Sequence, residues 1–182
     1  MYKTKAVFLD RDGVICENID RPEGISSPRF LKEFHFTNNI KKYLQQLCDL
    51  NFNLFIVTNQ PDIARRKMSY TILGMMHEII GQYLPITAIR ACLHDNNDNC
   101  QCRKPKPGML LDLAKFYEID LSHSYMIGDN ITDMQAGKVV GCKTIFLADF
   151  TTGWVDITYD TDKYTDHIAY NMAEAVKIIS GG

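Results

Sequence analysis

Residues 6–12 read AVFLDRD, in which four apolar residues run directly into two carboxylates that flank an arginine. A continuous apolar run of this kind is typical of a buried parallel strand, and the end of such a strand is where open α/β sheets place their chemistry. If the strand continues beyond Leu9, Asp10 and Asp12 point to one face, and Gly13 permits a sharp turn away. Two acids are costly to bury without a compensating cation or proton. We therefore take this stretch as the candidate reaction centre.

The composition excludes several classes of protein. The 182 residues are 46% apolar and 23% charged, as in an ordinary globular protein. The formal net charge of −2 gives no general attraction to nucleic acid or to an anionic membrane surface. No apolar run reaches the roughly 20 residues that span a bilayer, and the N-terminal residues lack the apolar core of a signal peptide. We expect a single domain over residues 1–182 that is monomeric and cytoplasmic and binds neither nucleic acid nor membrane.

Short apolar runs and helical periodicities alternate along the chain. The apolar runs predict strands over residues 6–9, 54–57, 86–92, 125–127 and 144–147. The periodic segments predict helices over residues 40–48, 72–83, 107–117 and 132–140 and after Asn171, with Ser69 and Asn171 as N-terminal caps. Residues 13–36 and most of 149–168 are expected to be loops. The alternation predicts an α/β fold with a doubly wound, mostly parallel sheet and helices on both faces.

Three of the predicted strands end in polar side chains, namely Asp10 with Asp12, Thr58 with Asn59, and Asp129. In a parallel sheet these ends gather at one edge. Three carboxylates with few nearby cations suit a hard ion with oxygen ligands, and Mg²⁺ is the usual choice where phosphate is also bound. Asp133 lies one helical turn after Asp129, and the simpler interpretation of this acid is that it stabilises the start of a helix.

A second group of candidate ligands lies within residues 92–102, in the pattern Cys92-x-His94-x5-Cys100-x-Cys102. Three thiols and one imidazole within eleven residues match a tetrahedral, closed zinc site. The intervening DNNDN has no apolar side chain that could hold its shape, so we expect structural Zn²⁺. Free cysteines or a disulfide are the alternatives, and an intracellular location disfavours the disulfide. Because this zinc loop leads directly into Arg103 and Lys104, the metal would position both cations.

Four segments, in this order, resemble the motifs of the haloacid dehalogenase (HAD) phosphatases: Asp10-Arg11-Asp12-Gly13-Val14, Thr58-Asn59-Gln60, Arg103-Lys104-Pro105-x-Pro107-Gly108 and Gly128-Asp129-x3-Asp133. Any one of these motifs is weak evidence. Four in order, each at a predicted strand end or in the adjoining loop, are highly specific, and they span most of the chain. The resemblance implies a doubly wound, HAD-like Rossmannoid fold without a cap domain, and a mechanism through an aspartyl phosphate.

The resemblance also assigns roles to the acids. Asp10 would be the nucleophile that attacks phosphorus. Asp12 would protonate the leaving alcohol and then take a proton from the hydrolytic water. Mg²⁺ would be held by Asp10, by the backbone carbonyl of Asp12 and by Asp129, and it would offset the repulsion between the nucleophile and the phosphate.

The remaining motif residues would hold the substrate. Thr58 would bind a phosphoryl oxygen, and Lys104 would neutralise charge that develops in the transition state; without the surrounding motif, Lys104 would be interpreted as part of a solvated basic run. The further residues expected to bind substrate are Asn59, Gln60, Arg103, Asn18, Arg21 and Asn130.

A zinc loop directly before Cys-Arg-Lys-Pro-x-Pro-Gly resembles one branch of the family, which holds D-glycero-D-manno-heptose 1,7-bisphosphate phosphatases and histidinol-phosphate phosphatases. This branch implies a small phosphorylated sugar as substrate, with the heptose bisphosphate favoured and histidinol phosphate as the alternative. The chain departs from the branch where Pro61-Asp62 replaces a usual Ser-Gly pair, where Leu93 replaces a proline, and in a long 17–36 loop. These departures concern the walls of the pocket, so they bear on the choice of sugar and not on the reaction.

Two functions of other classes remain open from the sequence. A receiver-type signalling module also combines an aspartate, Mg²⁺, Thr and Lys on a doubly wound sheet. Asp12 argues against it, because an acid two residues after the phosphate acceptor promotes turnover. A zinc-organised module that binds nucleic acid or protein is the other alternative, and the net charge of −2 weighs against nucleic acid.

Overall fold

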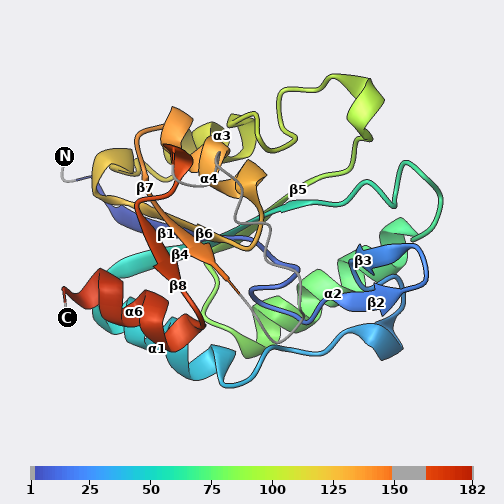
Figure 1. The fold of residues 1–182 in the computed structure, drawn as a ribbon, viewed down its shortest axis with the longest axis horizontal. Coiled ribbons are helices and arrows are strands. Elements are labelled where there is room, and N and C mark those ends of the chain that lie inside the picture. Colours follow the sequence, from blue (N-terminus) through green and yellow to red (C-terminus); the bar gives the residue numbers. More distant parts are fainter. Residues whose placement is uncertain (1–2, 149–162, 182) are drawn as a thin grey trace.

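The computed structural model describes residues 3–148 and 163–181 and is built around a six-stranded sheet (Figure 1). The order of the strands is β5-β4-β1-β6-β7-β8, and all neighbouring pairs are parallel. The strands are β1 (Lys5–Leu9), β4 (Phe52–Asn59), β5 (Ala88–Cys92), β6 (Tyr125–Gly128), β7 (Lys143–Leu147) and β8 (His167–Ala169). The predicted parallel, doubly wound sheet is thus confirmed.

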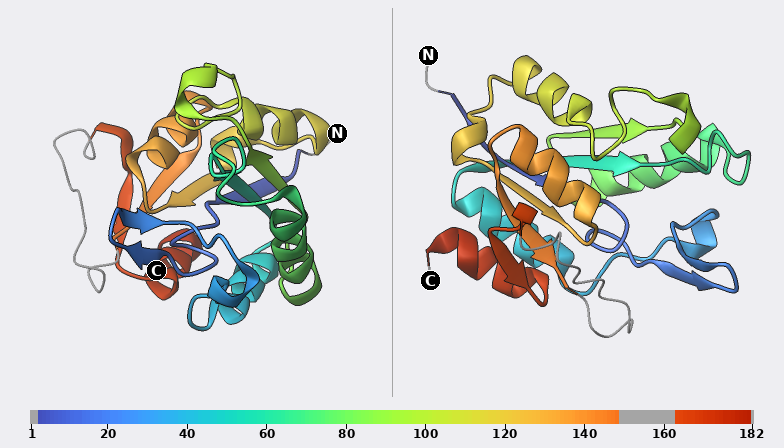
Figure 2. Two further views of the ribbon diagram at one scale, coloured as in Figure 1. Left: turned by 90° about the vertical axis from the view of Figure 1, so that its right-hand side faces the viewer. Right: turned by 45° about the horizontal axis from the view of Figure 1, so that its top comes forward.

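Helices cover both faces of the sheet, as predicted (Figures 1 and 2). One face packs against α1 (Ile40–Asp49), α2 (Tyr70–Tyr83) and α6 (Met172–Ser180), and the other against α3 (Gly108–Phe116) and α4 (Ile131–Val139). Successive residues of β1 alternate between the two cores, and none of Ala6–Leu9 is exposed. Burial on both faces explains why the strand is apolar without interruption.

The helices begin where the sequence predicts. Ser69 caps α2 by accepting a hydrogen bond from the backbone N–H of Ile72 at 3.2 Å, and Asn171 caps α6 by accepting one from Glu174 at 3.0 Å. No helix in residues 3–148 and 163–181 is long and apolar enough to cross a membrane.

The expected loop over residues 13–36 contains regular structure, so this prediction was wrong in part. A hairpin of β2 (Ile19–Arg21) and β3 (Gly24–Ser26) is followed by a 3-10 turn, η1 (Leu31–Glu33). Strands of three residues are too short to show an alternating pattern. The hairpin lies beyond the carboxyl ends of the central strands (Figure 2).

One further strand, β8, differs from expectation. His167 and Ile168, expected in a loop, belong to β8 and pair with β7, while residues 149–162 of that predicted loop lie outside the described residues. The first strand ends at Leu9, as predicted. Asp10 and Asp12 lie beyond the end of this strand, so the expected placement on one face of a continuing strand does not apply, and their carboxylates contact different partners.

Candidate active site

A cleft of about 1820 Å³ opens beyond the carboxyl ends of the strands. The strand order reverses at β1, with β4 and β5 on one side and β6, β7 and β8 on the other. Ligands of open α/β sheets bind at such a switch point. The cleft is lined, among others, by Asp10, Asp12, Asn59, Lys104 and Asp129. Five of the predicted site residues thus meet where the topology favours a ligand.

Three carboxylates form an acidic group in the cleft. One oxygen each of Asp10, Asp129 and Asp133 lies within 4.8 Å of the others. Burial raises the pKa of Asp129 well above its usual range, and repulsion from Asp10 and Asp133 adds to the rise. With one lysine among three acids, the group has an excess of two negative charges when ionised, which suits a divalent cation with oxygen ligands.

Asp133 contributes to this group although its predicted role was to stabilise a helix. Both functions are present, because its Oδ2 accepts a hydrogen bond from the backbone N–H of Asn130 at 3.3 Å and completes a capping box at the start of α4. The side chain is fully buried, and its burial raises its pKa to about 7 against the attraction of Lys104. Its spacing of four residues from Asp129 was the signal in the sequence that could have identified it as a candidate metal ligand.

Lys104 contacts both the acidic group and strand β4. Its Nζ donates to Asp10 Oδ1 at 2.8 Å and to the carbonyl of Val57 at 2.7 Å, and it forms an ion pair with Asp133. Asn59 fixes the backbone of Lys104 through two hydrogen bonds of 3.1 Å each, one to its carbonyl and one from its N–H. Burial alone would lower the pKa of Lys104, but Asp10 and Asp133 outweigh burial and raise it. The lysine therefore stays charged beside the candidate nucleophile.

Gly13 permits the close approach of the Asp129 side chain to the backbone that follows β1. Its φ is +80°, and a Cβ at this position would lie 1.9 Å from Asp129 Oδ2. Any other residue would push the carboxylate out of place. The first motif therefore needs glycine at this position to leave room for the Asp129 carboxylate.

Asp12 lies in a buried network separate from the acidic group. Arg11, which is fully buried, donates from Nη2 to Asp12 Oδ1 at 2.8 Å, and Cys16 Sγ lies 3.3 Å from the same oxygen. Oδ2 of Asp12 accepts from Gln60 Nε2 at 2.6 Å and from Ser27 Oγ at 2.9 Å. Burial alone would raise the pKa of Asp12, but the charge and hydrogen bonds of Arg11 lower it overall. Arg11 and Ser27 were not predicted, because sequence spacing does not show which way a side chain turns.

The other predicted residues lie in different environments. Thr58 is fully buried and accepts from Gln60 Nε2 at 2.9 Å. Asn18 donates to Asp129 Oδ2 at 3.1 Å, so it belongs to the acidic group's surroundings. Arg21 instead pairs with Glu33 at 2.7 Å within the segment that carries the hairpin.

Arg103 and Asn130 line the cleft. Arg103 Nη1 donates to the carbonyl of His94 at 3.4 Å, which connects the arginine with the zinc loop. Asn130 accepts from the N–H of Thr132 at 3.0 Å and so caps α4. Substrate binding by Arg103 and Asn130 remains a prediction.

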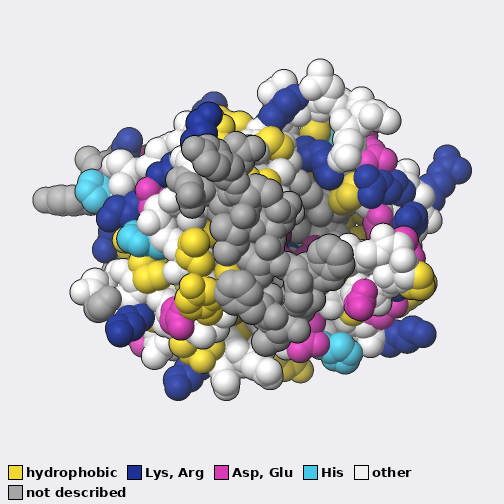
Figure 3. All heavy atoms as spheres, viewed as in Figure 1, with side chains coloured by type: hydrophobic (Ala, Val, Ile, Leu, Met, Phe, Trp, Pro, Cys, Tyr) yellow, Lys and Arg dark blue, Asp and Glu magenta, His cyan; other side chains and the backbone are white. Residues whose placement is uncertain are grey.

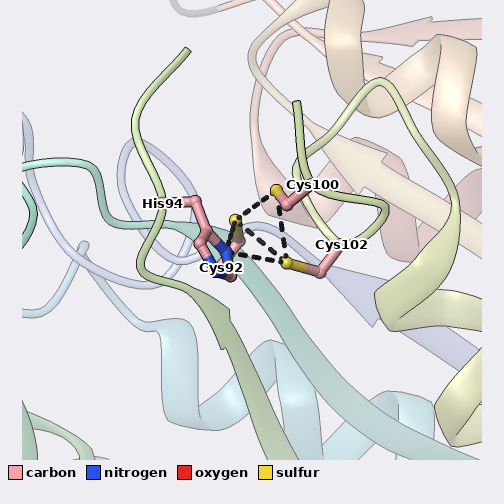
Figure 4. A group of neighbouring side chains, drawn as sticks. All are labelled: Cys92, His94, Cys100 and Cys102. Carbon is pink, nitrogen blue, oxygen red and sulfur yellow. Dashed lines mark hydrogen bonds between the residues drawn. The ribbon is translucent and has the colours of Figure 1, made fainter. Parts of the chain in front are cut away.

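The predicted zinc ligands converge on one point (Figure 4). Cys92, His94, Cys100 and Cys102 each offer one atom within 4.8 Å of the others. Cys102 Sγ lies 3.2 Å from Cys92 Sγ, 3.5 Å from Cys100 Sγ and 3.3 Å from Nδ1 of His94. Ligands about 2.3 Å from a tetrahedral zinc would be roughly 3.7 Å apart, close to these separations. The donor set fits a small tetrahedral metal ion.

Basic and acidic side chains are interspersed over the face shown in Figure 3. In the coloured part of this view, dark blue and magenta side chains lie next to one another.

Comparison with known proteins places the chain in a family. The HAD-hydrolase-like family model matches residues 101–175. A D-glycero-alpha-D-manno-heptose-1,7-bisphosphate 7-phosphatase of Campylobacter jejuni is 39% identical over 80% of this chain and 83% of its own. The D-glycero-beta-D-manno-heptose-1,7-bisphosphate 7-phosphatase of Pasteurella multocida is 35% identical over 97% of each chain.

A solved structure agrees with these relatives. The D,D-heptose 1,7-bisphosphate phosphatase of B. bronchiseptica, complexed with magnesium and phosphate, superposes with a TM-score of 0.78 at 25% identity, covering 97% of this chain and 98% of that one. The expected resemblance to the HAD phosphatases is thereby confirmed. Because the two relatives are 39% and 35% identical over most of this chain, it belongs to the HAD-like phosphatases, in the family of the D-glycero-D-manno-heptose-1,7-bisphosphate 7-phosphatases.

Proposed function

We propose that the protein is a Mg²⁺-dependent phosphomonoesterase that removes the 7-phosphate from D-glycero-D-manno-heptose 1,7-bisphosphate. The observation that carries the proposal is the position of Asp10, whose carboxylate lines the cleft, lies 2.8 Å from Lys104 Nζ and belongs to a group of three acids. The names of the relatives support the substrate. Membership of this family favours an enzyme over the receiver-type and binding-module alternatives.

In the first step, a carboxylate oxygen of Asp10 attacks phosphorus, and the bond between phosphorus and the sugar oxygen breaks. The sugar oxygen takes a proton from Asp12 and leaves as the alcohol. In the second step, water attacks the phosphorus of the aspartyl phosphate, gives a proton to Asp12 and releases phosphate and the Asp10 carboxylate. Asp12 must carry a proton before the first step, and the negative charge of an arriving phosphate favours that protonation.

Lys104 and the three acids have different electrostatic roles. Lys104 faces the nucleophile and compensates the charge that develops on the phosphoryl oxygens. We propose that Asp10, Asp129 and Asp133, with the backbone carbonyl of Asp12, hold Mg²⁺. The ion supplies further charge neutralisation at the phosphate when it is bound.

We further propose that the cysteines and histidine of the zinc loop bind structural Zn²⁺. Four converging donors on a polar loop support this assignment. The metal would fix the loop that leads into Arg103 and Lys104. A single domain, a cytoplasmic location and a monomeric state remain predictions, which subcellular fractionation and light scattering would test.

The test combines two variants with a panel of substrates. Asp10→Asn should abolish phosphate release from the heptose bisphosphate, while Asp112→Asn, an exposed acid on α3, should leave it unchanged. Wild-type kcat/KM should be higher for either anomer of the heptose bisphosphate than for histidinol phosphate. Full activity of Asp10→Asn would refute the assigned nucleophile, and a preference for histidinol phosphate would refute the assigned substrate.

A further inference from the structure

Two residues that line the cleft, from segments distant in the sequence, meet in a single contact. Asp62 follows the second motif, and Arg29 lies in the 17–36 segment. Arg29 Nε donates to Asp62 Oδ2 at 2.7 Å, and the two side chains are only 14% and 9% exposed. An ion pair that is this buried, with a direct hydrogen bond, is a specific attachment and not an exposed contact of little energetic consequence.

Hydrogen bonds to Glu33 hold together the segment that carries Arg29. Arg21 donates to both carboxylate oxygens of Glu33, at 3.3 and 2.7 Å, and the backbone N–H of Arg29 donates to Glu33 Oε2 at 2.8 Å. The hairpin β2–β3 and the turn η1 are therefore tied together. The Arg29–Asp62 pair attaches this whole segment to the residues that follow β4.

Ser27 lies between the hairpin and this pair. It follows the last residue of β3 and precedes Pro28, which is buried, and Arg29, which is partly buried. Its hydroxyl donates to Asp12 Oδ2 at 2.9 Å. The attachment of the hairpin segment thus determines where Ser27 stands relative to the candidate acid–base group.

The Ser27 hydroxyl differs chemically from the other two groups that donate to Asp12 Oδ2. Arg11 Nη2 at 3.1 Å and Gln60 Nε2 at 2.6 Å are donors only, so they favour the ionised carboxylate. A serine hydroxyl can donate to a carboxylate and accept from a carboxylic acid. Among these partners of Oδ2, Ser27 also lines the cleft beside Asp12, so it is placed to orient the carboxyl there.

We infer that Ser27 is a positioning residue for the acid–base group Asp12, and that the Arg29–Asp62 pair holds Ser27 in place. The inference rests on the proposed function, because it assigns Ser27 to the proton-transfer step of that reaction. The sugar alcohol needs this proton to leave, whereas p-nitrophenolate leaves at neutral pH without one. The two kinds of leaving group thus separate proton transfer from all other contributions to rate.

The experiment measures kcat/KM, which reports the steps up to release of the first product, for the heptose bisphosphate and for p-nitrophenyl phosphate. Ser27→Ala should lower the value for the sugar phosphate by about 10–100-fold, a part of the usual contribution of general acid catalysis, and change that for p-nitrophenyl phosphate less than about twofold. Ser27→Thr, which keeps the hydroxyl, should recover the sugar phosphate activity. Lys138→Met is the matched control, since Lys138 lies in the last turn of α4 and pairs with Asp166, and neither residue lines the cleft.

A second set of variants tests the attachment. Asp62→Asn should show the same selective loss as Ser27→Ala, and the exchange Arg29→Asp with Asp62→Arg should restore activity in part. Equal losses on both substrates, or a Ser27→Thr enzyme as slow as Ser27→Ala, would overturn the inference. A wild-type enzyme that releases phosphate from neither substrate would instead refute the proposed function, and the inference would fall with it.

Discussion

Lys104 is a buried cation between two carboxylates, those of Asp10 and Asp133. Lys104→Met should lower kcat by about 10²–10³-fold, because the charge that faces the reacting phosphoryl group is lost. It should also lower the unfolding free energy of the metal-free protein by about 3–5 kcal/mol, since buried carboxylates lose their partner. Steady-state kinetics and urea unfolding measure the two effects.

The control for this variant is Lys115→Met, at an exposed position in the last turn of α3. Its unfolding free energy should change by less than about 0.5 kcal/mol, as for most surface substitutions. A Lys104→Met protein as stable as the Lys115→Met protein would contradict the ion pairs assigned to Lys104.

At the scale of single residues, the sequence revealed which side chains gather and not how they are connected. Asp10, Lys104 and Asp129 were predicted because each follows a recognisable strand or motif, and they meet in the cleft. Arg11 and Ser27 were missed, because their contacts with Asp12 depend on the turn after Leu9 and on the hairpin segment. A side chain's partner across the fold leaves no local pattern in the sequence.

Helix α4 must lie close to the sheet to place Asp133, and Gly137 makes this possible. A Cβ at Gly137 would lie 2.7 Å from Cβ of Met126 and 2.9 Å from Cγ2 of Thr144. Gly137→Ala should therefore destabilise the protein by about 1–3 kcal/mol, although alanine favours helices. Activity should fall as well, because the shifted helix displaces Asp133. Thermal unfolding and phosphate release measure both results.

Gly74 is the matched control, since it lies on an exposed face of α2 and a Cβ there would meet nothing within 4 Å. Gly74→Ala should stabilise the protein by about 0.5–1 kcal/mol, the ordinary gain from replacing glycine inside a helix. If both alanine variants shift stability in the same direction, the close packing of α4 on β6 and β7 is not what requires Gly137.

The zinc loop is an element with no apolar core of its own, so its order should depend on the metal. Cys102→Ser should reduce bound zinc from about one ion per chain to a small fraction of that, by metal analysis. It should raise KM more than it lowers kcat, because Arg103 adjoins the loop and contacts it at His94, whereas Lys104 is separately held by Asn59. Cys48→Ser, on α1 and outside the loop, is the control. Wild-type protein without zinc would refute the assignment.

At the scale of elements, the longer strands and the helices were predicted correctly, and the shortest strands were not. Strands β1 and β4 and the helices were predicted because their burial leaves a periodic or continuous apolar pattern over several residues. The hairpin β2–β3 and strand β8 were missed. Each of these strands has three residues, and pairing is their main stabilisation, so composition gives no signal. Strand β8 pairs with β7, which lies about twenty residues earlier in the sequence, and the segment of the hairpin is held together by the Arg21–Glu33 ion pair.

For the whole molecule, the order of the strands explains why separate motifs form one site. Asp10 follows β1 and Asp129 follows β6, and these two strands are neighbours on either side of the switch in strand order. The backbone N–H of Asp10 donates to the carbonyl of Ile127 at 2.9 Å, which extends the pairing to the edge of the cleft. The alternation of elements predicted this edge, whereas the separations among the acids required the structure.

The acidic group links the stability of the whole protein to pH and to Mg²⁺. The pKa of Asp133 is about 7 in the fold against 3.8 for a free side chain, and that of Asp129 is also raised. Between these two values the folded state binds a proton that the unfolded state does not, so this contribution to stability decreases as pH rises and is lost above about pH 7.

At the proposed site, Mg²⁺ would bind the ionised carboxylates and compete with these protons. Saturating Mg²⁺ should therefore raise Tm more at about pH 8 than at about pH 5.5, because at the lower pH the metal must displace protons held by Asp129 and Asp133. Differential scanning calorimetry with and without Mg²⁺ at both pH values measures this difference. Asp133→Asn should reduce it, since asparagine binds no proton over this range. An increase in Tm that is equal at the two pH values would show that the ion binds elsewhere than at the raised carboxylates.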